Sequence, residues 1–293
     1  MGIVESLRQI PDINFTENVN LGYRTSFGVG GRAKYYVSPE SVYSFMRCIN
    51  AATSWDFKYK IIGNGTNILV SDKGYDGLII CTKNLNSIFL DKGEIISLCG
   101  TPLNKFVNFV SGSGRTGAEG LTGIPATVGG AIYQNAGAFG YTISDYVYEI
   151  TCVKDGKTVK YKKSACGFGY RTSAFQKSGE FIVSARFRFP KRKKTVKNTF
   201  YERRLDAQPS GRTCGSVFTN PPSDYAGRLI ENAGLKGAKI GGAQVSEKHA
   251  NFIVANENAA AQDVYLLINE IKQKVYREFG VKLKEEVEYL GEF

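Results

Sequence analysis

Glycine and other small residues dominate residues 112–140, GSGRTGAEGLTGIPATVGGAIYQNAGAFG, more than an ordinary helix or strand would allow. Glycine has no Cβ atom and adopts positive φ angles freely, so the backbone of such a stretch can approach another group closely. Loops of this kind gather amide N–H groups around an anion. The composition therefore favours binding of an extended anionic ligand, and the pyrophosphate of a dinucleotide is the obvious candidate.

A second glycine loop, GNGTN at residues 63–67, connects two expected strands. Its closely spaced amides could form another concavity for an anion, although the same residues also suit a plain tight turn. Alone the loop is a weak signal. Two such loops in one domain favour a bound dinucleotide.

Two glycine triplets match dinucleotide-binding fingerprints in sequence but not in the secondary structure expected around them. Residues 112–117 fit G-x-G-x-x-G, and residues 28–33 fit its looser form. The fingerprint requires a strand before the glycines and a helix after them. The first triplet instead follows an expected helix, and KYYV at 34–37 after the second is an expected strand. We therefore do not expect a Rossmann domain.

The chain is poor in the residues that build metal centres and hydrolytic triads. It has one histidine, His249, and six cysteines that lie far apart without a C-x-x-C pair. A structural zinc site would lack ligands, and a Ser-His-Asp hydrolase would depend on His249 without a G-x-S-x-G elbow. We expect no metal site and free thiols, because a chain of 293 residues needs no disulfides to build its core.

Positive charge exceeds negative charge, with 38 Lys and Arg against 27 Asp and Glu and a formal net charge of +11. This balance favours anionic partners. A nucleic-acid-binding protein is one interpretation, with FRFPKRKKTVK at residues 187–197 as its best basic patch. Nucleotide substrates and cofactors explain the same surplus, and we interpret the basic run as a solvated linker that marks a domain boundary near residue 190.

Helices are expected on both sides of this boundary. Ser38 can cap a helix that runs to Thr53, with Pro39 in its first turn, and Thr101 and Pro102 open a second helix. After the boundary, the expected helices run from a cap at Ser223 to Ala233, and from Ala259 to Phe279.

Strands alternate with these helices. Residues 60–72 and 77–81 predict short strands around a glycine turn, and residues 146–163 predict a hairpin that turns at Asp155 and Gly156. Apolar residues at every second position predict a strand over residues 181–189. The segment VKLKEEVEYL, residues 281–290, predicts another strand. Both halves are therefore expected to be α+β.

No run reaches the roughly 18 consecutive apolar residues of a membrane helix. The first residues, MGIVESLRQIPDINF, lack the basic start and apolar centre of a signal peptide. We expect a soluble cytoplasmic protein without a membrane partner.

Seven blocks of sequence, in order, resemble the UDP-N-acetylenolpyruvoylglucosamine reductase (MurB) family of bacterial cell-wall flavoenzymes. They cover most of residues 25–291: TSFGVGGRAKYYV, IIGNGTNILVSD, GLTGIPATVGGAIYQNAGAFG, YRTSAFQ, CGSVFTNPP, AGRLIENAGLKGAKIGGAQVSEKHANFIV and FGVKLKEEVEYLG. The span between the YRTSAFQ and CGSVF blocks is too short for the tyrosine-bearing loop of one subfamily, so the chain resembles the type II branch.

The resemblance implies a fold and a cofactor. Residues 1–190 would form an FAD-binding α+β domain of the vanillyl-alcohol oxidase (PCMH) type with two subdomains, and residues 191–293 a smaller α+β substrate-binding domain. The two glycine loops would hold FAD. The implied cofactor-binding residues are Gly63, Asn64, Gly65, Thr66, Asn67, Pro125, Thr127, Gly129, Gly130, Asn135 and Gly137.

The resemblance also implies three catalytic residues. Ser216 would donate a proton to the substrate carbanion, Arg171 would hold the substrate carboxylate, and Glu286 would support the enolate-like intermediate. The pattern alone favours a turn or capping role for Ser216 and a surface position for Arg171. Alternation alone puts Glu285, rather than Glu286, on the more apolar face of its strand, so the choice of Glu286 rests on the resemblance.

Four further residues match family positions near the nucleotide-sugar: Tyr170, Asn220, Lys236 and His249. Lys236 and His249 could equally be surface groups. The chain departs from the family pattern at Thr66, where serine is usual, at Ala126, where glycine is common, and at Phe139, which lacks the hydroxyl of a frequent tyrosine.

The implied activity is NADPH-dependent reduction of UDP-N-acetylglucosamine enolpyruvate to UDP-N-acetylmuramate through FAD, in peptidoglycan precursor synthesis. The partners would be the UDP-sugar and NADPH, with no nucleic acid, and the sequence is compatible with a monomer. Two rivals stay open. Another FAD-dependent oxidoreductase of the same superfold would share the FAD loops but not the C-terminal blocks, and a nucleic-acid binder would carry no flavin.

Overall fold

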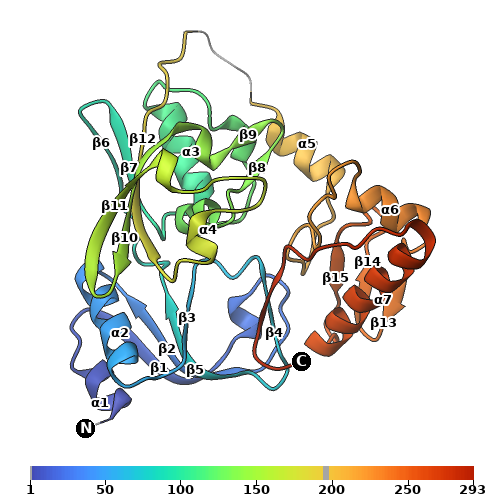
Figure 1. Cartoon of the computed structure of the whole chain (residues 1–293), viewed down its shortest axis with the longest axis horizontal. Coiled ribbons are helices and arrows are strands. Elements are labelled where there is room, and N and C mark those ends of the chain that lie inside the picture. The colour runs from blue at the N-terminus through green and yellow to red at the C-terminus, as the bar shows by residue number, and fades with distance from the viewer. Residues whose placement is uncertain (1, 194–197) are drawn as a thin grey trace. The chain divides into compact units, whose positions relative to one another are not determined.

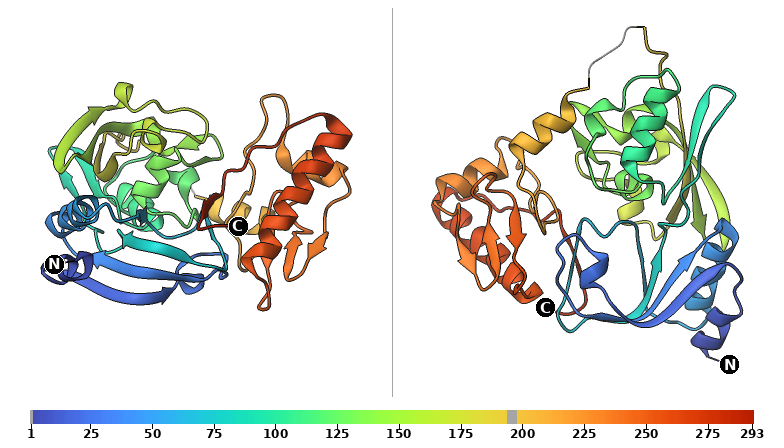
Figure 2. Two further views of the ribbon diagram at one scale, coloured as in Figure 1. Left: turned by 60° about the horizontal axis from the view of Figure 1, so that its bottom comes forward. Right: turned by 180° about the vertical axis from the view of Figure 1, so that it is seen from behind.

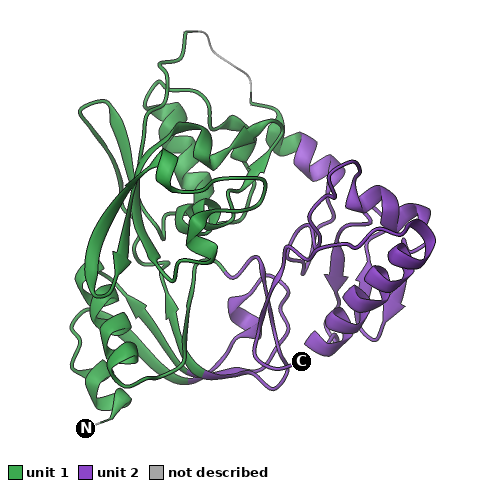
Figure 3. Cartoon of the chain, viewed as in Figure 1, with its two compact units in different colours: residues 1–17, 35–64, 77–202 green, residues 18–34, 65–76, 203–293 purple. Residues whose placement is uncertain are grey.

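The computed structural model of the chain describes residues 2–193 and 198–293. They divide into two compact units (Figure 3), each of which combines three segments of the chain. Unit 1 comprises Met1–Glu17, Tyr35–Asn64 and Gly77–Glu202, and unit 2 comprises Asn18–Lys34, Gly65–Asp76 and Arg203–Phe293. The last residues of the expected basic linker, 194–197, lie outside the described residues. The domain boundary at residues 190 and 191 stays a prediction.

Helices and strands interleave along the described chain (Figure 1). The α-helices are α1 (Ile3–Arg8), α2 (Val42–Ser54), α3 (Leu103–Gly112), α4 (Val128–Tyr133), α5 (Phe200–Ala207), α6 (Ala226–Asn232) and α7 (Ala261–Phe279). The first strands are β1 (Ile13–Asn20), β2 (Arg32–Pro39), β3 (Tyr59–Ile62), β4 (Ile68–Val70), β5 (Tyr75–Cys81), β6 (Ile88–Asp91), β7 (Glu94–Leu98) and β8 (Gly137–Ala138). The later strands are β9 (Tyr141–Thr142), β10 (Val147–Lys154), β11 (Lys157–Lys162), β12 (Phe181–Phe187), β13 (Lys239–Ile240), β14 (Ala243–Val245), β15 (Ile253–Ala255) and β16 (Glu288–Leu290). Short 3₁₀ helices cover Gly22–Arg24, Glu119–Leu121, Ile143–Tyr146, Lys163–Ala165 and Ala174–Gln176.

Unit 1 contains an antiparallel five-stranded sheet in the order β11-β10-β12-β7-β6. It also contains most of a four-stranded sheet in the order β1-β2-β5-β3, in which β3 and β5 are parallel. The expected hairpin is confirmed, because β10 and β11 pair around Asp155 and Gly156, both at positive φ. The strand expected over residues 181–189 is confirmed as β12, which ends two residues earlier, at Phe187.

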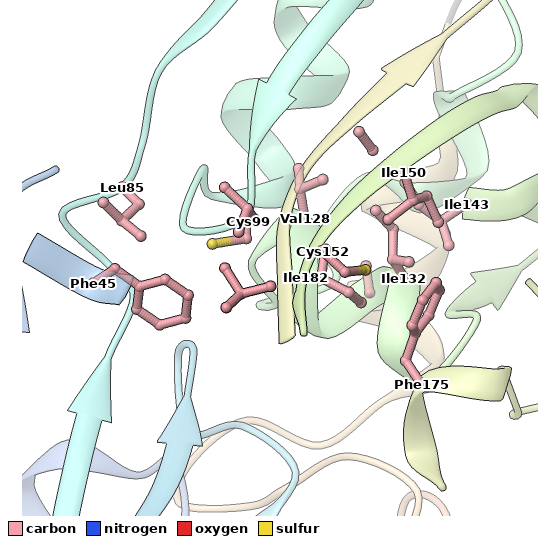
Figure 4. Close-up of a cluster of buried hydrophobic side chains, with 14 of the residues drawn as sticks. Phe45, Leu85, Cys99, Val128, Ile132, Ile143, Ile150, Cys152, Phe175 and Ile182 are labelled. Atoms are coloured by element: carbon pink, nitrogen blue, oxygen red, sulfur yellow. The ribbon is translucent and has the colours of Figure 1, made fainter. Parts of the chain in front are cut away.

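The core of unit 1 lies where α3 and α4 pack against the five-stranded sheet. Phe106 of α3 and Phe187 of β12 place their ring centroids 4.7 Å apart. Val128 and Ile132 of α4 lie close to Cys99 and Cys152 in the same buried cluster (Figure 4). The buried face of α4 is thus part of a packed core.

The six cysteines are free and buried, as expected. Burial raises the pKa of the Cys48 thiol to about 12, and it has the same effect on Cys99. Neither thiol forms a thiolate at neutral pH.

Two expected helix starts are wrong. Strand β2 continues through Pro39, and α2 begins at Val42 with Ser41, not Ser38, as its cap. The side-chain oxygen of Ser41 accepts the amide of Ser44 at 3.0 Å. Helix α6 likewise begins three residues after Ser223, which is exposed and caps nothing.

Unit 2 packs α6 and α7 with an antiparallel sheet in the order β13-β14-β15. Figures 1 and 2 show α7 running along this sheet. A second, two-stranded sheet pairs β16 with β4 in parallel. The expected strand VKLKEEVEYL is therefore regular only at Glu288–Leu290, and its earlier part contributes a single bridge from Glu285 to Phe218.

A carboxylate from a distant segment caps α7, whose own N-cap residue, Ala260, has no hydrogen-bonding side chain. The Asp72 carboxylate accepts the amides of Ala261 and Gln262, both at 2.9 Å. We expect Asp72→Ala to lower the free energy of unfolding by about 1 kcal/mol, the usual effect of losing a helix cap. Denaturant titration checks this value, with Asp76→Ala, an exposed surface carboxylate, as the control. Equal stability of both variants would show that the cap contributes nothing.

Among the described residues, none of the helices combines the length and the apolar character that a membrane crossing needs.

Candidate functional site

The two glycine loops meet within unit 1. The Asn64 side-chain amide donates to the carbonyl oxygen of Pro125 at 2.8 Å. A Cβ atom added at Gly63 would lie 2.5 Å from Oγ1 of Thr127. Only glycine at residue 63 permits this approach, so the structure brings the predicted loops together and explains one of their glycines.

The second loop continues into α4, where Gly129 serves close packing. Thr127 caps the helix by accepting the amide of Gly130 at 3.2 Å. The Gly129 amide donates to the carbonyl of Cys99 at 2.7 Å, and a Cβ at Gly129 would lie 2.7 Å from that of Cys99. The Val128 amide is also bonded, to the Thr101 carbonyl. These amides are therefore committed within the protein.

The amides of the first loop are different. Within the described residues, the N–H groups of Asn64, Gly65, Thr66 and Asn67 donate no hydrogen bond to another residue. Gly65 has a φ of +68°, and a Cβ there would lie 2.4 Å from the Arg24 carbonyl oxygen. The loop thus offers backbone donors to an anion in a conformation that requires glycine.

Asn135 carries an unsatisfied acceptor in unit 1. Its side chain is 6% exposed, and its Nδ2 donates to the carbonyl of Gly169 at 2.8 Å. Its Oδ1 is buried without a hydrogen-bond partner among the described residues. A buried acceptor left unpaired costs roughly 1–3 kcal/mol, so this oxygen is a candidate acceptor for a donor that the described residues do not supply.

Arg171 lies on a loop that folds back on the Asn135 segment. Its Nη2 donates to the Gly137 carbonyl at 2.9 Å, and its guanidinium carbon lies 5.2 Å from the ring centroid of Tyr170. The backbone φ of Arg171 is +53°, a strained value that the surrounding contacts maintain. Tyr170 is 59% exposed. The structure therefore groups Arg171 and Tyr170 with the second glycine loop.

Ser216 and Glu286 lie on neighbouring extended segments of unit 2. Ser216 forms a bridge with Phe252, and the Glu286 amide donates to the carbonyl of Val217 at 2.8 Å. The carbonyl of Glu286 accepts Nδ2 of Asn67, from the first glycine loop, at 2.9 Å. Two of the three predicted catalytic residues are thus held in register by main-chain hydrogen bonds.

The two adjacent glutamates have different surroundings. Glu285 alternates with the buried Leu283 and Val287, as the pattern predicts, and its carboxylate lies 2.6 Å from Nζ of Lys272. This ion pair already commits the Glu285 carboxylate to a structural contact. The assignment of catalysis to Glu286 stays a prediction.

The predicted nucleotide-sugar residues of unit 2 have structural contacts of their own. Oδ1 of Asn220 accepts the amide of Ala226 at 3.0 Å and so supplies the cap of α6. Nζ of Lys236 lies 2.7 Å from a carboxylate oxygen of Glu231. Nδ1 of His249 accepts the Asn251 amide at 3.2 Å, which leaves Nε2 as the protonated nitrogen of the neutral ring.

Burial lowers the pKa of His249 below its ordinary value of 6.5, and the charge of Lys236 also lowers it. The folded chain then binds this proton more weakly than the unfolded chain, so the folded state loses stability as the pH falls below 6.5. We expect wild-type unfolding free energy to decrease between about pH 7 and pH 5.5, and His249→Gln to show a flatter profile. Carboxyl groups with shifted pKa values titrate below 4.5, outside this window.

Urea unfolding at a series of pH values measures the difference. His249 is the only histidine, so the comparison isolates one imidazole. Parallel profiles for the two proteins would contradict the expected role of its burial.

The sequence did not single out three residues that the structure brings to these loops and strands. Oγ1 of Thr25 and Oγ of Ser26 are buried without a partner among the described residues, and the Ser26 amide donates to the Gly65 carbonyl at 3.1 Å. Asn251 contacts the Ser216 segment directly. The first two lie in the TSFGVGG block and Asn251 in the block that ends in HANFIV, so the resemblance could have directed attention to all three, but the sequence around Asn251 does not reveal its contacts.

The predicted site residues therefore fall into two groups. The group in unit 1 is Gly63, Asn64, Pro125, Thr127, Gly129, Gly130, Asn135, Gly137, Tyr170 and Arg171. The group in unit 2 is Gly65, Thr66, Asn67, Ser216, Asn220, Lys236, His249 and Glu286. Among the described residues there is no cluster of three or more histidine, cysteine or acidic side chains that could hold a metal ion.

Two family models match successive parts of the chain. The FAD binding domain model matches residues 33–161, and the model of the UDP-N-acetylenolpyruvoylglucosamine reductase C-terminal domain matches residues 207–290. The first match contains the two glycine loops, and the second contains Ser216 and Glu286.

A more distant likeness concerns the fold alone. The glucooligosaccharide oxidase of Acremonium strictum is 13% identical and superposes with a TM-score of 0.51 over 98% of this chain and 60% of the oxidase. With the FAD binding domain match, it confirms the expected fold class, an FAD-binding α+β domain of the vanillyl-alcohol oxidase type followed by a smaller α+β domain.

Full-length relatives give the family. The UDP-N-acetylenolpyruvoylglucosamine reductase of Thermotoga sp. (strain RQ2) is 41% identical over 274 residues, which cover 92% of this chain and 91% of the relative. The crystal structure of the MurB reductase from Thermus caldophilus superposes with a TM-score of 0.80 at 31% identity, over 95% of this chain and 99% of that one. The chain therefore belongs to the UDP-N-acetylenolpyruvoylglucosamine reductase family.

Proposed function

We propose that this protein reduces UDP-N-acetylglucosamine enolpyruvate to UDP-N-acetylmuramate with FAD as cofactor and NADPH as hydride donor. Family membership over more than nine-tenths of the chain is the observation that carries the proposal. The product is a peptidoglycan precursor, so the protein acts in cell-wall synthesis and thereby in cell shape and division.

The residues of the two glycine loops fit FAD. The open amides of residues 64–67 suit a pyrophosphate, and the unpaired Oδ1 of Asn135 suits a donor such as a ring N–H. The absence of a side chain at Gly63 lets the loops approach each other. We assign FAD binding to the eleven loop residues expected from the sequence and add Thr25 and Ser26, whose buried hydroxyls lack partners among the described residues.

The chemistry divides between cofactor and protein. When bound, FAD supplies the redox chemistry, delivery of a hydride from NADPH to the methylene carbon of the enolpyruvyl ether. The substrate then carries negative charge beside its carboxylate. The guanidinium of Arg171 holds that carboxylate, Glu286 supports the enolate-like form, and the Ser216 hydroxyl protonates the carbon.

The remaining assignments concern the nucleotide-sugar and the domains. We assign substrate binding to Tyr170, Asn220, Lys236 and His249. Residues 1–190 form the FAD-binding domain and residues 191–293 the substrate-binding domain in this proposal. The protein works in the cytoplasm, and its positive charge attracts anionic nucleotides, with no nucleic acid or membrane as partner.

Flavin absorbance tests the proposed function. The purified protein is expected to be yellow, to lose its visible flavin absorbance on anaerobic addition of NADPH, and to recover it on addition of the enolpyruvyl UDP-sugar. Bleaching by NADPH without recovery would favour another FAD-dependent oxidoreductase of the same superfold. A colourless protein that binds no FAD and binds nucleic acid with a steep salt dependence would refute the proposal.

A further inference from the structure

The segment that carries Ser216 is not part of a regular sheet. It follows Gly215, whose φ is +85°, and it forms isolated bridges from Ser216 to Phe252 and from Phe218 to Glu285. Isolated bridges restrain a chain less than a continuous ladder does. Another contact is needed to fix the direction of the Ser216 side chain.

Asn251 supplies that contact with both ends of its amide. Its Nδ2 donates to the carbonyl of Phe218 at 2.8 Å, and its Oδ1 accepts the Phe218 amide at 3.0 Å. Its own carbonyl accepts the Val217 amide at 2.9 Å. Asn251 is 4% exposed, so these hydrogen bonds are sheltered from water.

This clamp has the geometry of a strand pair built from one side chain. A neighbouring strand would pair with the N–H and C=O of a single residue, and the Asn251 amide does the same for Phe218. On the opposite side of the segment, the Glu286 amide donates a hydrogen bond to the Val217 carbonyl. Peptide planes on both sides of Val217 are thereby fixed, and the Ser216 hydroxyl starts two residues from the clamp.

We propose that Asn251 is a positioning residue for the Ser216 hydroxyl and acts through the main chain of Val217 and Phe218. The proposal rests on the proposed role of Ser216 as proton donor. Misplacement of a reacting group by about 1 Å costs about a hundredfold in rate. Loss of the clamp therefore slows protonation of the substrate and, with it, recovery of the flavin, because hydride addition to the methylene carbon stays reversible until the carbanion is protonated. Reduction of the flavin by NADPH is unchanged, because Ser216 takes no part in that step.

A double-mutant cycle in the full-length FAD-loaded protein tests this mechanism. Asn251→Ala is expected to slow substrate-dependent recovery of flavin absorbance roughly 10–100-fold, with unchanged bleaching by NADPH. In a Ser216→Ala background the same change is expected to cost nothing further. Equal losses in both backgrounds, or no loss in either, would overturn the proposal.

Two further variants separate positioning from general damage. Asn251→Asp keeps the side-chain volume and the acceptor for the Phe218 amide but turns a carboxylate oxygen toward the Phe218 carbonyl, so a loss at least as large as that in Asn251→Ala is expected. Asn251→Ser, which is smaller and uncharged, replaces Asn251→Ala in the cycle if that variant does not fold. Thr219→Ala removes a side-chain hydrogen bond to the Lys284 carbonyl from the same segment without touching the clamp, and its turnover is expected to match the wild type. A loss in Thr219→Ala equal to that in Asn251→Ala would overturn the specific role of Asn251.

Hydrogen exchange provides a readout that does not depend on turnover. The peptide that contains Val217 and Phe218 is expected to exchange faster in Asn251→Ala than in the wild type, because the Phe218 amide loses its acceptor. Unchanged exchange would contradict the clamp. Wild-type turnover in Ser216→Ala alone would refute the proposed role of Ser216, whereas a slow Ser216→Ala with additive losses would refute only the role of Asn251.

Discussion

Replacement of Ser216 by alanine is expected to lower turnover of the enolpyruvyl UDP-sugar by about 10²–10⁴-fold, the usual contribution of a positioned general acid. Binding of FAD and bleaching of the flavin by NADPH are expected to stay at wild-type levels, because the hydroxyl is needed only in the reaction with the enolpyruvyl substrate, where protonation of the carbon draws hydride transfer forward. Stopped-flow absorbance measures the two stages separately. Methyl in place of hydroxymethyl on a partly exposed residue changes little packing, so a loss of this size reports on chemistry.

Ser223→Ala is a matched control for this experiment. Ser223 belongs to the same unit, is exposed and caps no helix. Its turnover should equal that of the wild type. Wild-type turnover in Ser216→Ala would remove Ser216 from the mechanism, and slow bleaching by NADPH would place the hydroxyl in the wrong stage.

Arg171→Ala is expected to reduce kcat/KM for the same substrate by roughly a hundredfold or more, because a guanidinium beside a developing anion stabilises it directly. Arg171→Lys should recover only part of this loss, since an ammonium keeps the charge but not the forked pair of donors that matches a carboxylate. Both variants keep a non-glycine residue at the φ of +53°, so backbone strain is common to them. Their difference isolates the guanidinium group.

Steady-state kinetics with the UDP-sugar and with NADPH as separate variables provide the measurement. Arg188→Ala is the control, because Arg188 belongs to the same unit, is exposed and pairs with Glu94. If Arg171→Ala turns over substrate like the control, Arg171 does not hold the carboxylate.

Local features of the fold could be predicted from the sequence. Asp155 and Gly156 fix their hairpin because both positive φ angles suit these residue types. The α2 start could not be fixed in this way, because Ser38 and Ser41 are equally good caps by type. Ser41 is the cap because β2 pairs with β5 and keeps Pro39 extended, so the helix cannot begin after Ser38.

The residue pattern could not predict which strands pair when they lie far apart in the sequence. Residues 60–72 predict two short strands, but β3 pairs with β5 and β4 pairs with β16, near the other end of the chain. Alternation over residues 281–290 identifies the buried Leu283 and Val287 correctly, yet it does not reveal that only Glu288–Leu290 forms a ladder. Which strands meet depends on the packing of the whole unit.

The candidate site also has one part that could be predicted from the sequence and another part that could not. Its glycine loops could be predicted from composition, since their close approach demands residues without a Cβ atom. Asn251 could not, because its importance comes from a neighbour 33 positions away along the chain. The unpaired Oδ1 of Asn135 also becomes apparent only when burial and hydrogen bonds are known.

The pairing of β4 with β16 has a consequence for synthesis on the ribosome. Among the described residues, β4 has β16 as its only partner strand, and the Asn67 contact next to it spans 219 positions. At a translation speed of about 5–20 residues per second, the nascent chain exposes β4 for roughly 10–40 seconds before its partner is made. Termination of synthesis before Glu286 would therefore leave this edge permanently open and the carbonyl that Asn67 contacts unmade.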